Sequence, residues 1–366
     1  GDTGEIIWEL IPTTEIGRVE VIKGAASAIY GSTAIGGVIN VISKEITSNP
    51  LTFISTHIGV YADPSHDEWK WNDDMRTYSG ISLSHSRRFE KLGISLSFSR
   101  IEDNGYRMND WDTKYIGYLK AKYDFSIATS LSFIGTGFVR DRGTFNFWKD
   151  VDNALRPPDA DVGQEQPSRR FIFGLSLDHV FDEDLSMSFK PSIYSTHWED
   201  ETESANNSTS NLFRAELMGN YKLVDQSKLI FGLEGQYGKT ESDIFGNRTS
   251  GGFAAFAQAD YNFDFPLKIL FGLRYDYTRV GFIDGESSVS PKFGLNYKLS
   301  DDTVRRGSYG KGFRAPTLAE AFTSTSASGI VVKPNPDLKS ETAYSFELGI
   351  NHRFSSISIS KELSFL

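Results

Sequence analysis

Most of the chain consists of segments, each about ten residues long, in which apolar and polar side chains alternate. In residues 92–99 the even positions are Leu, Ile or Phe, and the odd positions are Gly or Ser. Residues 267–277 place Leu, Ile, Phe and Tyr on one face and Lys268, Arg274 and Asp276 on the other. A period of two residues is the signature of β-strands whose two faces meet different surroundings. The pattern therefore predicts an all-β fold.

The linkers between these segments are alternately short and long. Tight turns are expected at 88–91, 125–129, 181–184, 224–227, 264–266 and 300–302. Longer polar loops are expected at 61–76, 102–112, 141–168, 198–210, 240–251, 279–288 and 311–340. This alternation favours an antiparallel up-and-down sheet whose two rims face different compartments, as in outer-membrane barrels.

A soluble β-sandwich is the alternative, because it also has one buried and one wet face. We expect about fifteen strands in one meander, whereas open sheets rarely exceed about ten strands. Strands of about ten residues, tilted by roughly 45°, span about 23 Å, close to the roughly 25 Å apolar band of a membrane barrel. No segment approaches the ~18 apolar residues of a spanning helix. These features favour a transmembrane β-barrel.

The first 47 residues follow another pattern. Residues 18–22 and 38–42 read as short strands, and residues 25–30 as one helical turn. The glycines predicted to form turns are Gly24, Gly31, Gly36 and Gly37. We therefore divide the chain into a compact unit at 1–47, too short to fold alone, and a barrel domain at 48–366.

Five segments carry a resemblance to a known family. They are residues 18–24 (RVEVIKG), 27–32 (SAIYGS), 34–44 (AIGGVINVISK), 309–318 (YGKGFRAPTL) and 335–342 (NPDLKSET). The first three resemble the end of the plug domain of TonB-dependent outer-membrane receptors. The last two resemble that family's late-barrel signature. Ala25 departs from the pattern, because the family usually has proline there.

The resemblance implies an antiparallel up-and-down transmembrane β-barrel with an N-terminal α+β plug remnant. Such receptors have about 22 strands. The chain therefore looks incomplete relative to a full barrel, since the early plug and the segment that binds the energising protein would precede Gly1. No signal peptide is recognisable at the N-terminus, so we interpret the sequence as a mature or trimmed product.

In the family, plug arginines pair with barrel glutamates. The apolar positions of residues 344–350 are expected to face lipid, which turns Glu347 inward. The resemblance suggests that Arg18 pairs with Glu341 or Glu347, although each could be a solvated lumen charge. The predicted plug–barrel contacts are Arg18, Glu20, Arg314, Glu341 and Glu347.

Ligand capture is expected at the long loops, where aromatic side chains lie beside cations. This mixture suits flat, anionic metal chelates. The alternative is an interfacial aromatic girdle. The candidate ligand-binding residues are Tyr106, Trp111, Arg142, Phe145, Phe147 and Trp148.

Several other chemistries find little support. The chain has no cysteine and a formal charge of −10, which argues against thiolate zinc sites and nucleic-acid binding. Residues 238–240 (GKT) lack the earlier glycine of a phosphate loop. The aspartates at 150, 152, 159 and 161 lack the ordered spacing of a calcium loop. We expect no cofactor and no enzymatic activity.

The resemblance implies energised uptake of a scarce metal chelate, most simply a ferric siderophore, across a Gram-negative-type outer membrane. The expected partners are the chelate, outer-membrane lipid and a TonB-type protein whose binding segment is not in this sequence. The chain as written is therefore expected to bind but not to transport. Cobalamin, haem, other metal complexes and oligosaccharides stay open as substrates. A passive porin or adhesin barrel and an outer-membrane hydrolase are the rival functions.

Overall fold

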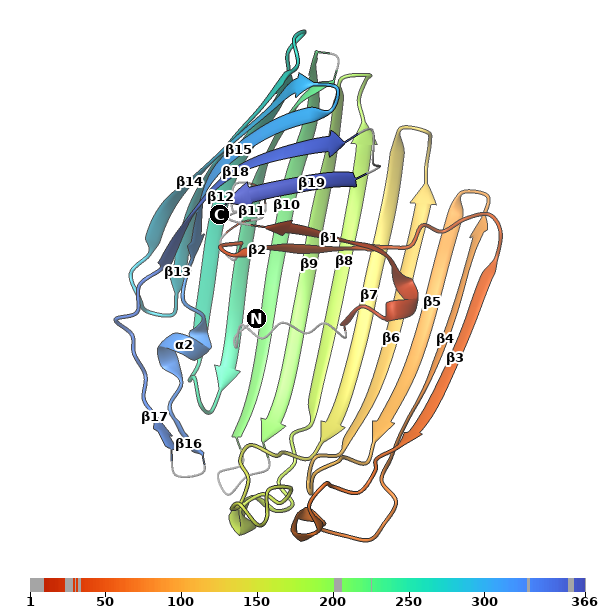
Figure 1. The fold of residues 1–366 in the computed structure, drawn as a ribbon, viewed down its shortest axis with the longest axis vertical. Helices are drawn as coiled ribbons and strands as arrows, with labels where there is room; N and C mark the ends of the chain where they lie inside the picture. Colours follow the sequence, from red (N-terminus) through yellow and green to blue (C-terminus); the bar gives the residue numbers. More distant parts are fainter. Residues whose placement is uncertain are drawn as a thin grey trace.

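The computed structural model describes residues 10–23, 29, 31, 34–200, 206–224, 226–327, 330–354 and 359–365. Within them, 15 strands form one antiparallel sheet in which chain neighbours are also spatial neighbours (Figure 1). The strands are β3 (Leu51–Val60), β4 (Thr77–Phe89), β5 (Leu92–Asp103), β6 (Asp112–Asp124), β7 (Thr129–Arg142), β8 (Ser168–Val180), β9 (Leu185–Asp200), β10 (Asn206–Val224), β11 (Ser227–Ser242), β12 (Arg248–Asn262), β13 (Leu267–Val280), β14 (Glu286–Ser300), β15 (Thr303–Arg314), β18 (Glu341–Phe354) and β19 (Ile359–Phe365). The predicted meander is confirmed.

The sheet is open, with β3 and β19 at its two ends. It curves so that one face is concave, as a wall of a barrel would be (Figure 1). The described residues thus form a partial antiparallel barrel, which agrees with the fold predicted from the sequence.

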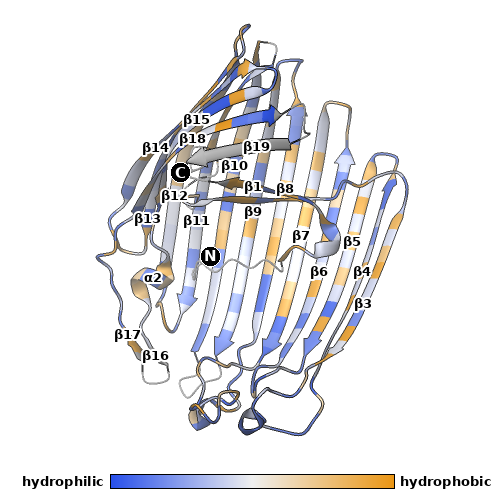
Figure 2. Ribbon diagram, in the orientation of Figure 1, coloured by the Kyte–Doolittle hydropathy of each residue, from blue (hydrophilic) through white to orange (hydrophobic). Residues whose placement is uncertain are grey.

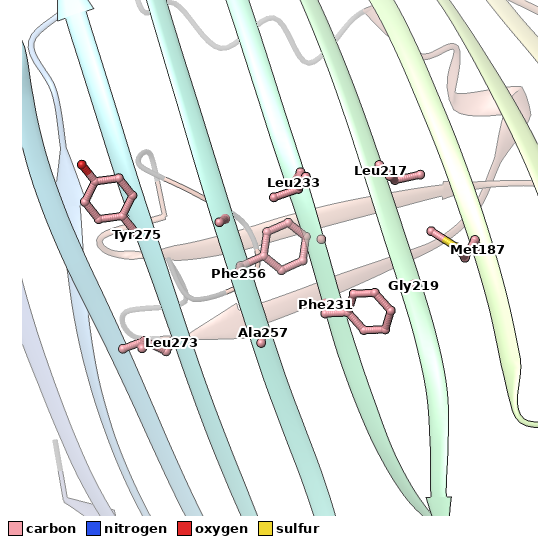
Figure 3. Close-up of a pocket in the computed structure, with 11 residues that line it drawn as sticks. Met187, Leu217, Gly219, Phe231, Leu233, Phe256, Ala257, Leu273 and Tyr275 are labelled. Carbon is pink, nitrogen blue, oxygen red and sulfur yellow. The ribbon is translucent and has the colours of Figure 1, made fainter.

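Hydrophobic and hydrophilic residues alternate along the strands, as predicted (Figure 2). On β13 the outward Leu273 is 44% exposed, whereas the inward Arg274 is 2% exposed. Other outward side chains, such as Leu217 and Leu233, are seen in Figure 3. The convex face is thus apolar and the concave face polar, a pattern typical of transmembrane barrel walls.

Short connections lie at one end of the strands and long connections at the other. Two predicted loops, 198–210 and 240–251, are wrong in extent, because β9 continues to Asp200, β10 begins at Asn206 and β11 continues to Ser242. The side chains there are polar, which made the sequence look like loop. Strand pairing nevertheless continues, with Ser210 and Thr240 hydroxyls 2.6 Å apart.

The N-terminal unit contains a 3-10 turn, η2 (Thr13–Glu15), and an antiparallel hairpin of β1 (Ile16–Lys23) and β2 (Gly37–Ser43). The hairpin lies across the concave side of the sheet (Figure 1). The two predicted strands are confirmed. Gly24 and nearly all of the predicted helical turn at 25–30 lie outside the described residues.

The long loops carry the remaining elements. They are η3 (Asp67–Trp69), η4 (Asp159–Asp161), α2 (Leu318–Phe322), β16 (Thr325–Ala327) and β17 (Ile330–Val332). Helix α2 begins with a capping box between Thr317 and Glu320. Its buried residues pack on Val280, Ile283 and Leu338. None of the helices in the described ranges has the length and apolar character needed to span a bilayer.

Candidate functional site

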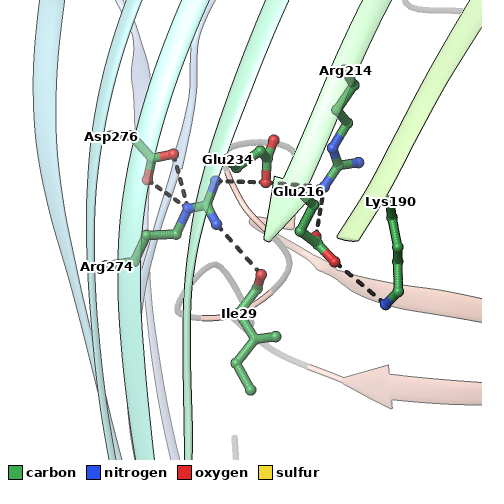
Figure 4. Close-up of polar contacts among 7 residues, drawn as sticks. All are labelled: Ile29, Lys190, Arg214, Glu216, Glu234, Arg274 and Asp276. Carbon is green, nitrogen blue, oxygen red and sulfur yellow. Dashed lines mark hydrogen bonds and ion pairs between the residues drawn. The ribbon is translucent and has the colours of Figure 1, made fainter. Parts of the chain in front are cut away.

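Arg274 on β13 is the most deeply buried charge on the concave face for which contacts are described. Its Nε donates to the two carboxylate oxygens of Asp276 at 2.9 and 3.1 Å, and its Nη2 donates to Glu234 Oε2 at 3.1 Å. The guanidinium also lies 5.4 Å from the centre of the Phe256 ring. A buried charge is costly unless it is paired, and here two carboxylates compensate one cation (Figure 4).

The same arginine touches the N-terminal unit. Arg274 Nη1 donates to the carbonyl oxygen of Ile29 at 3.5 Å. Gly31 has a φ of +87°, and a Cβ placed on it would lie 3.1 Å from Arg274 Nη2. Glycine is therefore favoured at 31 for two reasons, its left-handed backbone and the closeness of the barrel arginine.

Ion pairs continue from Arg274 along the wall. Arg214 Nη2 lies 2.9 Å from Glu234 Oε2 and 3.5 Å from Glu216 Oε2. Lys190 Nζ lies 3.5 Å from Glu216 Oε1. We call this set the ionic wall; its members are Lys190, Arg214, Glu216, Glu234, Arg274 and Asp276. The three cations and three carboxylates alternate, so the cluster is formally neutral.

A second contact region lies on β5, β6 and β7. Glu15 Oε2 accepts a hydrogen bond from Ser95 Oγ at 2.8 Å, and the Thr14 and Ser97 hydroxyls are 3.1 Å apart. Lys120 Nζ donates to Ser43 Oγ and to the carbonyl oxygen of Lys44, both at 2.8 Å.

Apolar contacts complete this region. Leu10, Ile116 and Phe138 form a buried cluster in which Phe138 has no exposed surface. We call the region the mixed wall; its members are Ser95, Ser97, Ile116, Lys120 and Phe138. The N-terminal unit is thus held at two separate places on the concave face.

The predicted pairing of Arg18 with Glu341 or Glu347 is wrong. Arg18 Nε donates to Glu20 Oε1 at 2.8 Å, within β1. Residues two apart on a strand share a face, so Glu20 is the nearer partner. Asn40 on the neighbouring β2 also donates to Glu20, at 3.2 Å.

The two glutamates find barrel partners instead. Arg314 lies directly opposite Glu341 in the β15–β18 register and donates to both of its carboxylate oxygens, at 2.9 and 3.0 Å. Arg314 also binds Glu320 of α2 at 3.0 Å. Arg306 pairs with Glu347 at 3.0 Å. These pairs join barrel strands and the α2 loop rather than plug and barrel.

The other predicted glycine turns differ from Gly31. Gly37 begins β2 with a φ of +143°, a conformation that favours glycine. A Cβ on Gly36 would meet nothing within 4 Å. The spatial requirement for glycine is therefore clear at 31, and the backbone requirement at 37.

A pocket of about 280 Å³ lies at the long-loop end of β5, β6 and β7. Of the predicted ligand-binding residues, Tyr106, Trp111, Arg142 and Phe145 line it. Phe147 and Trp148 are 43% and 68% exposed and are not among its lining residues. We call this the loop pocket. The structure brings four of the six candidates together.

Charges in the loop pocket are paired. Arg140 binds Asp112 through Nε and Nη2, at 2.6 to 3.1 Å. Arg107 binds Asp110 at 2.8 Å, and its guanidinium lies 4.2 Å from the centre of the Phe145 ring. The pocket combines aromatic faces with ion pairs whose partners could exchange for ligand oxygens.

Tyr61 of the loop pocket was not predicted from the sequence. Its hydroxyl donates to Asp103 Oδ2 at 2.8 Å. Partial burial and this hydrogen bond to a carboxylate raise the pKa of Tyr61 to about 12. Tyr61 is therefore protonated at neutral pH and acts as a hydrogen-bond donor.

Asn109 was also missed, and it connects two loops. Its φ is 63°, in the left-handed region that asparagine tolerates. Its Nδ2 donates to the carbonyls of Thr144 and Gln164 at 2.8 and 2.9 Å, and its Oδ1 accepts from Gly163 N at 3.1 Å. Asparagine is common in polar loops, so nothing specific in the sequence pointed to this role.

The acidic loop residues considered for calcium have protein partners. Asp159 accepts from Lys149 at 2.6 Å, and Asp150 accepts from the backbone and side chain of Asn153. Across the described ranges, no three or more His, Asp or Glu side chains gather in a way that could hold a metal ion.

Comparison with known proteins covers nearly the whole chain. The family description "TonB dependent receptor-like, beta-barrel" matches residues 57–361, and "TonB-dependent Receptor Plug Domain" matches residues 1–38. The vitamin B12 transporter BtuB of Vibrio vulnificus is 29% identical over 171 residues, which are 38% of this chain and 25% of that protein. The ferric enterobactin receptor PirA of Pseudomonas aeruginosa is 48% identical over 44 residues, 12% of this chain and 6% of that protein.

Solved structures share the fold. The siderophore receptor PirA of Pseudomonas aeruginosa superposes with a TM-score of 0.78 and 17% identity, over 98% of this chain and 63% of that chain. A mutant of the ferric enterobactin receptor PfeA of Pseudomonas aeruginosa, in complex with enterobactin, gives 0.72 and 15%, over 97% and 59%. The chain thus spans less than two thirds of these relatives. With a plug unit on the concave face of an up-and-down barrel wall, and a family match over most of its length, the chain belongs to the TonB-dependent receptors.

Proposed function

We propose that the protein is an outer-membrane receptor for the energised uptake of a metal chelate, most simply a ferric siderophore. The observation that carries this proposal is the arrangement of two sites on one wall. A plug unit is pinned to the polar interior by Arg274, and a loop pocket lies at the long-loop end of the same sheet. A ligand captured by the loops would reach the interior only if the plug moves.

The chemistry of the loop pocket supports a chelate with aromatic groups. Tyr106, Trp111 and Phe145 supply ring faces, and the Tyr61 hydroxyl, which donates to Asp103, adds a polar group. The lining has three arginines and three aspartates, so it offers no large excess of positive charge. These six charges are Arg107, Arg140, Arg142, Asp103, Asp110 and Asp112. Stacking and exchange of ion-pair partners would therefore contribute more than net charge.

Cobalamin is the second candidate substrate. It is favoured by the match to the vitamin B12 transporter BtuB, whose aligned segment is longer than that of the ferric enterobactin receptor PirA. Cobalamin is bulky and carries many amide groups, so we expect it to depend less on the arginines of the loop pocket than a ferric siderophore does.

Uptake by the full-length receptor tests the proposal. The gene is expressed in a Gram-negative host without its own siderophore and cobalamin receptors, with and without an intact TonB complex. We expect accumulation of radiolabelled ferric siderophore only when TonB is intact. Accumulation of labelled cyanocobalamin alone would select the second candidate. Passive entry of small solutes without TonB would contradict energised uptake.

Binding measurements on the purified chain test whether the ligand binds in the loop pocket. We expect ferric siderophore to quench tryptophan fluorescence, with Trp111 contributing. Tyr106→Ala and Phe145→Ala should each weaken binding by about tenfold, because each removes an aromatic contact worth roughly 1 kcal/mol or more. Phe147→Ala is the matched control, since Phe147 does not line the pocket. Equal losses at positions 145 and 147 would remove the loop pocket from consideration.

A substitution of Asn109 provides a second test of the loop pocket. Asn109→Gly keeps the left-handed backbone but removes the hydrogen bonds to Thr144, Gln164 and Gly163. We expect faster amide exchange in residues 143–165 and weaker ligand binding, by about tenfold, since losing positioned contacts costs on the order of 1 kcal/mol. Unchanged binding despite faster exchange would show that the loop 143–167 does not position the ligand.

A further inference from the structure

An apolar hollow of about 470 Å³ crosses strands β9 to β13 (Figure 3). We call it the outer hollow; its lining residues are Met187, Leu217, Gly219, Phe231, Gly232, Leu233, Ala255, Phe256, Ala257, Leu273 and Tyr275. Small-molecule sites have volumes of roughly 300–1,000 Å³, so the hollow is large enough for a ligand. It contains no charged side chain.

Strand register explains the hollow. Gly219 lies opposite Phe231, Phe231 opposite Ala257, and Ala257 opposite Leu273. Large side chains therefore alternate with small ones across neighbouring strands at one level of the sheet. A Cβ on Gly219 would lie 2.5 Å from Phe231 Cζ, so the Phe231 ring covers Gly219. The large side chains around Ala257 form the rim of the hollow.

An aromatic ring covers the inner face of the sheet behind the hollow. A Cβ on Gly232 would lie 2.5 Å from Phe256 Cζ, so the Phe256 ring occupies the place of a side chain there. Phe256 is 5% exposed and lies beneath the Arg274 guanidinium. Its ring therefore lies on the inner face of the sheet, opposite the side on which the hollow opens.

The hollow opens on the convex face. Leu233 and Leu273 of its rim are 49% and 44% exposed. The next residue after Leu273 is the buried Arg274, which points to the opposite, polar face. In a membrane barrel the convex face meets lipid, so this inference rests on the proposed outer-membrane function.

Strand geometry places the hollow at the depth of acyl chains. Tyr261 lies near the short turns, where barrel aromatics mark the membrane boundary. Ala257 is four residues farther along β12. At ~3.3 Å per residue and a tilt of about 40°, it lies about 10 Å from that boundary. Phe253 and Tyr277 form the next aromatic pair toward the long loops. The hollow lies between the two aromatic levels, away from lipid headgroups.

A second copy of the barrel fits the hollow poorly. A twofold contact centred on the hollow would place one hollow against the other, so the void would remain. A flexible hydrocarbon chain can enter the space and recover the missing dispersion contacts. We propose that the outer hollow binds one acyl chain of a membrane lipid.

Photolabelling tests this proposal. The protein is reconstituted in phosphatidylcholine vesicles that contain a trace of lipid with a diazirine in the middle of one acyl chain. We expect adducts at Leu217, Leu233 and Tyr275 to exceed those at Leu177, an outward residue of β8 that is 43% exposed, by about threefold or more, because a filled hollow retains the chain through added dispersion contacts.

Filling the hollow supplies the variant test. Ala257→Leu should remove the excess labelling at Leu233 and lower the lipid retained after detergent purification, measured by native mass spectrometry, by about threefold. Ala259→Leu is the matched control, since Ala259 lies on the same strand and face outside the hollow. It should leave labelling and retention unchanged.

The possible outcomes distinguish failure of the acyl-chain site from failure of the membrane location. Equal labelling of Leu177 and Leu233, or no effect of Ala257→Leu, would overturn the acyl site while leaving the membrane location intact. Absence of labelling at every outward residue would instead contradict the membrane location itself. A change of oligomeric state on Ala257→Leu, measured by light scattering, would assign the hollow to a second copy and overturn the lipid proposal.

Discussion

The ionic wall and the mixed wall hold the same plug unit by different physics. On the ionic wall, Arg274 is 2% exposed and reaches the plug through a backbone carbonyl. On the mixed wall, short hydroxyls, one lysine and a small apolar cluster share the contact. The first contact depends on a single cation and its carboxylates. The second is spread over several weak interactions.

The two walls differ in how much stability is lost when one contact residue is removed. Removing one partner from a buried ion-pair cluster leaves uncompensated charge, so the loss is abrupt. Removing one hydroxyl hydrogen bond costs only about 1 kcal/mol, so the loss is graded. We therefore expect the ionic wall to fix the position of the plug and the mixed wall to set how firmly it stays there.

The largest expected effect follows Arg274→Gln. Asp276 and Glu234 would lose their buried cation, and the folded protein should be destabilised by about 3–5 kcal/mol. Urea unfolding in detergent measures this, and amide exchange of β1 and β2 reports plug docking. Lys268→Gln is the control, because Lys268 faces the same side of β13 but is exposed. A loss at 274 no larger than at 268 would contradict the ionic wall.

Phe138→Ala should have the next largest effect. The ring is fully buried against Leu10 and Ile116, and its removal should cost about 3 kcal/mol. The outward Phe133→Ala on the same strand is the control, since lipid can fill the space it leaves. Faster amide exchange in residues 10–23 for Phe138→Ala alone would show that this ring holds the N-terminal unit. A similar rise in both variants would mean that the mixed wall is not an apolar anchor.

Gly31→Ala should cost about 1–2 kcal/mol, because alanine is strained at a φ of +87° and its methyl group would press on Arg274. Gly36→Ala is a matched control with no atom within 4 Å. Thermal unfolding and exchange of β2 amides give the readout. If the two variants behave alike, the close approach of plug and arginine does not matter for docking.

Ser97→Ala should have the smallest effect, about 1 kcal/mol, from losing the hydrogen bond to Thr14. Ser99→Ala loses a similar bond, but to Ser82 within the wall. Only the first variant should speed exchange in the residues next to Thr14. Loss of docking as complete as that of Arg274→Gln would erase the distinction between the two walls.

Sequence reasoning predicted the sheet well because the side-chain period of strands is fixed. It placed Arg274 and Asp276 opposite the apolar face before any contact was known. It also predicted that Tyr106, Trp111, Arg142 and Phe145 would lie together, because the long loops that carry them lie at the same rim of the sheet. These features depend on local pattern and connectivity.

The partners of Arg274 and Arg18 could not be predicted in the same way. The contact between Arg274 and the Ile29 carbonyl joins positions 245 residues apart and depends on how the plug docks. Arg18 instead donates a hydrogen bond to Glu20, two residues away on its own strand. Strand extensions beyond 198 and 240 were missed because polar strands in water resemble loops.

Ser95, Ser97 and Ser99 lie side by side on the inner face of β5 and are nearly covered in the folded protein. A hydroxyl that loses its partner to an opening movement can be hydrated at once, with little free energy lost. The strip uncovered beneath a displaced plug would therefore fill with water rather than collapse. A solute moving along this strip would then contact hydrated hydroxyl groups.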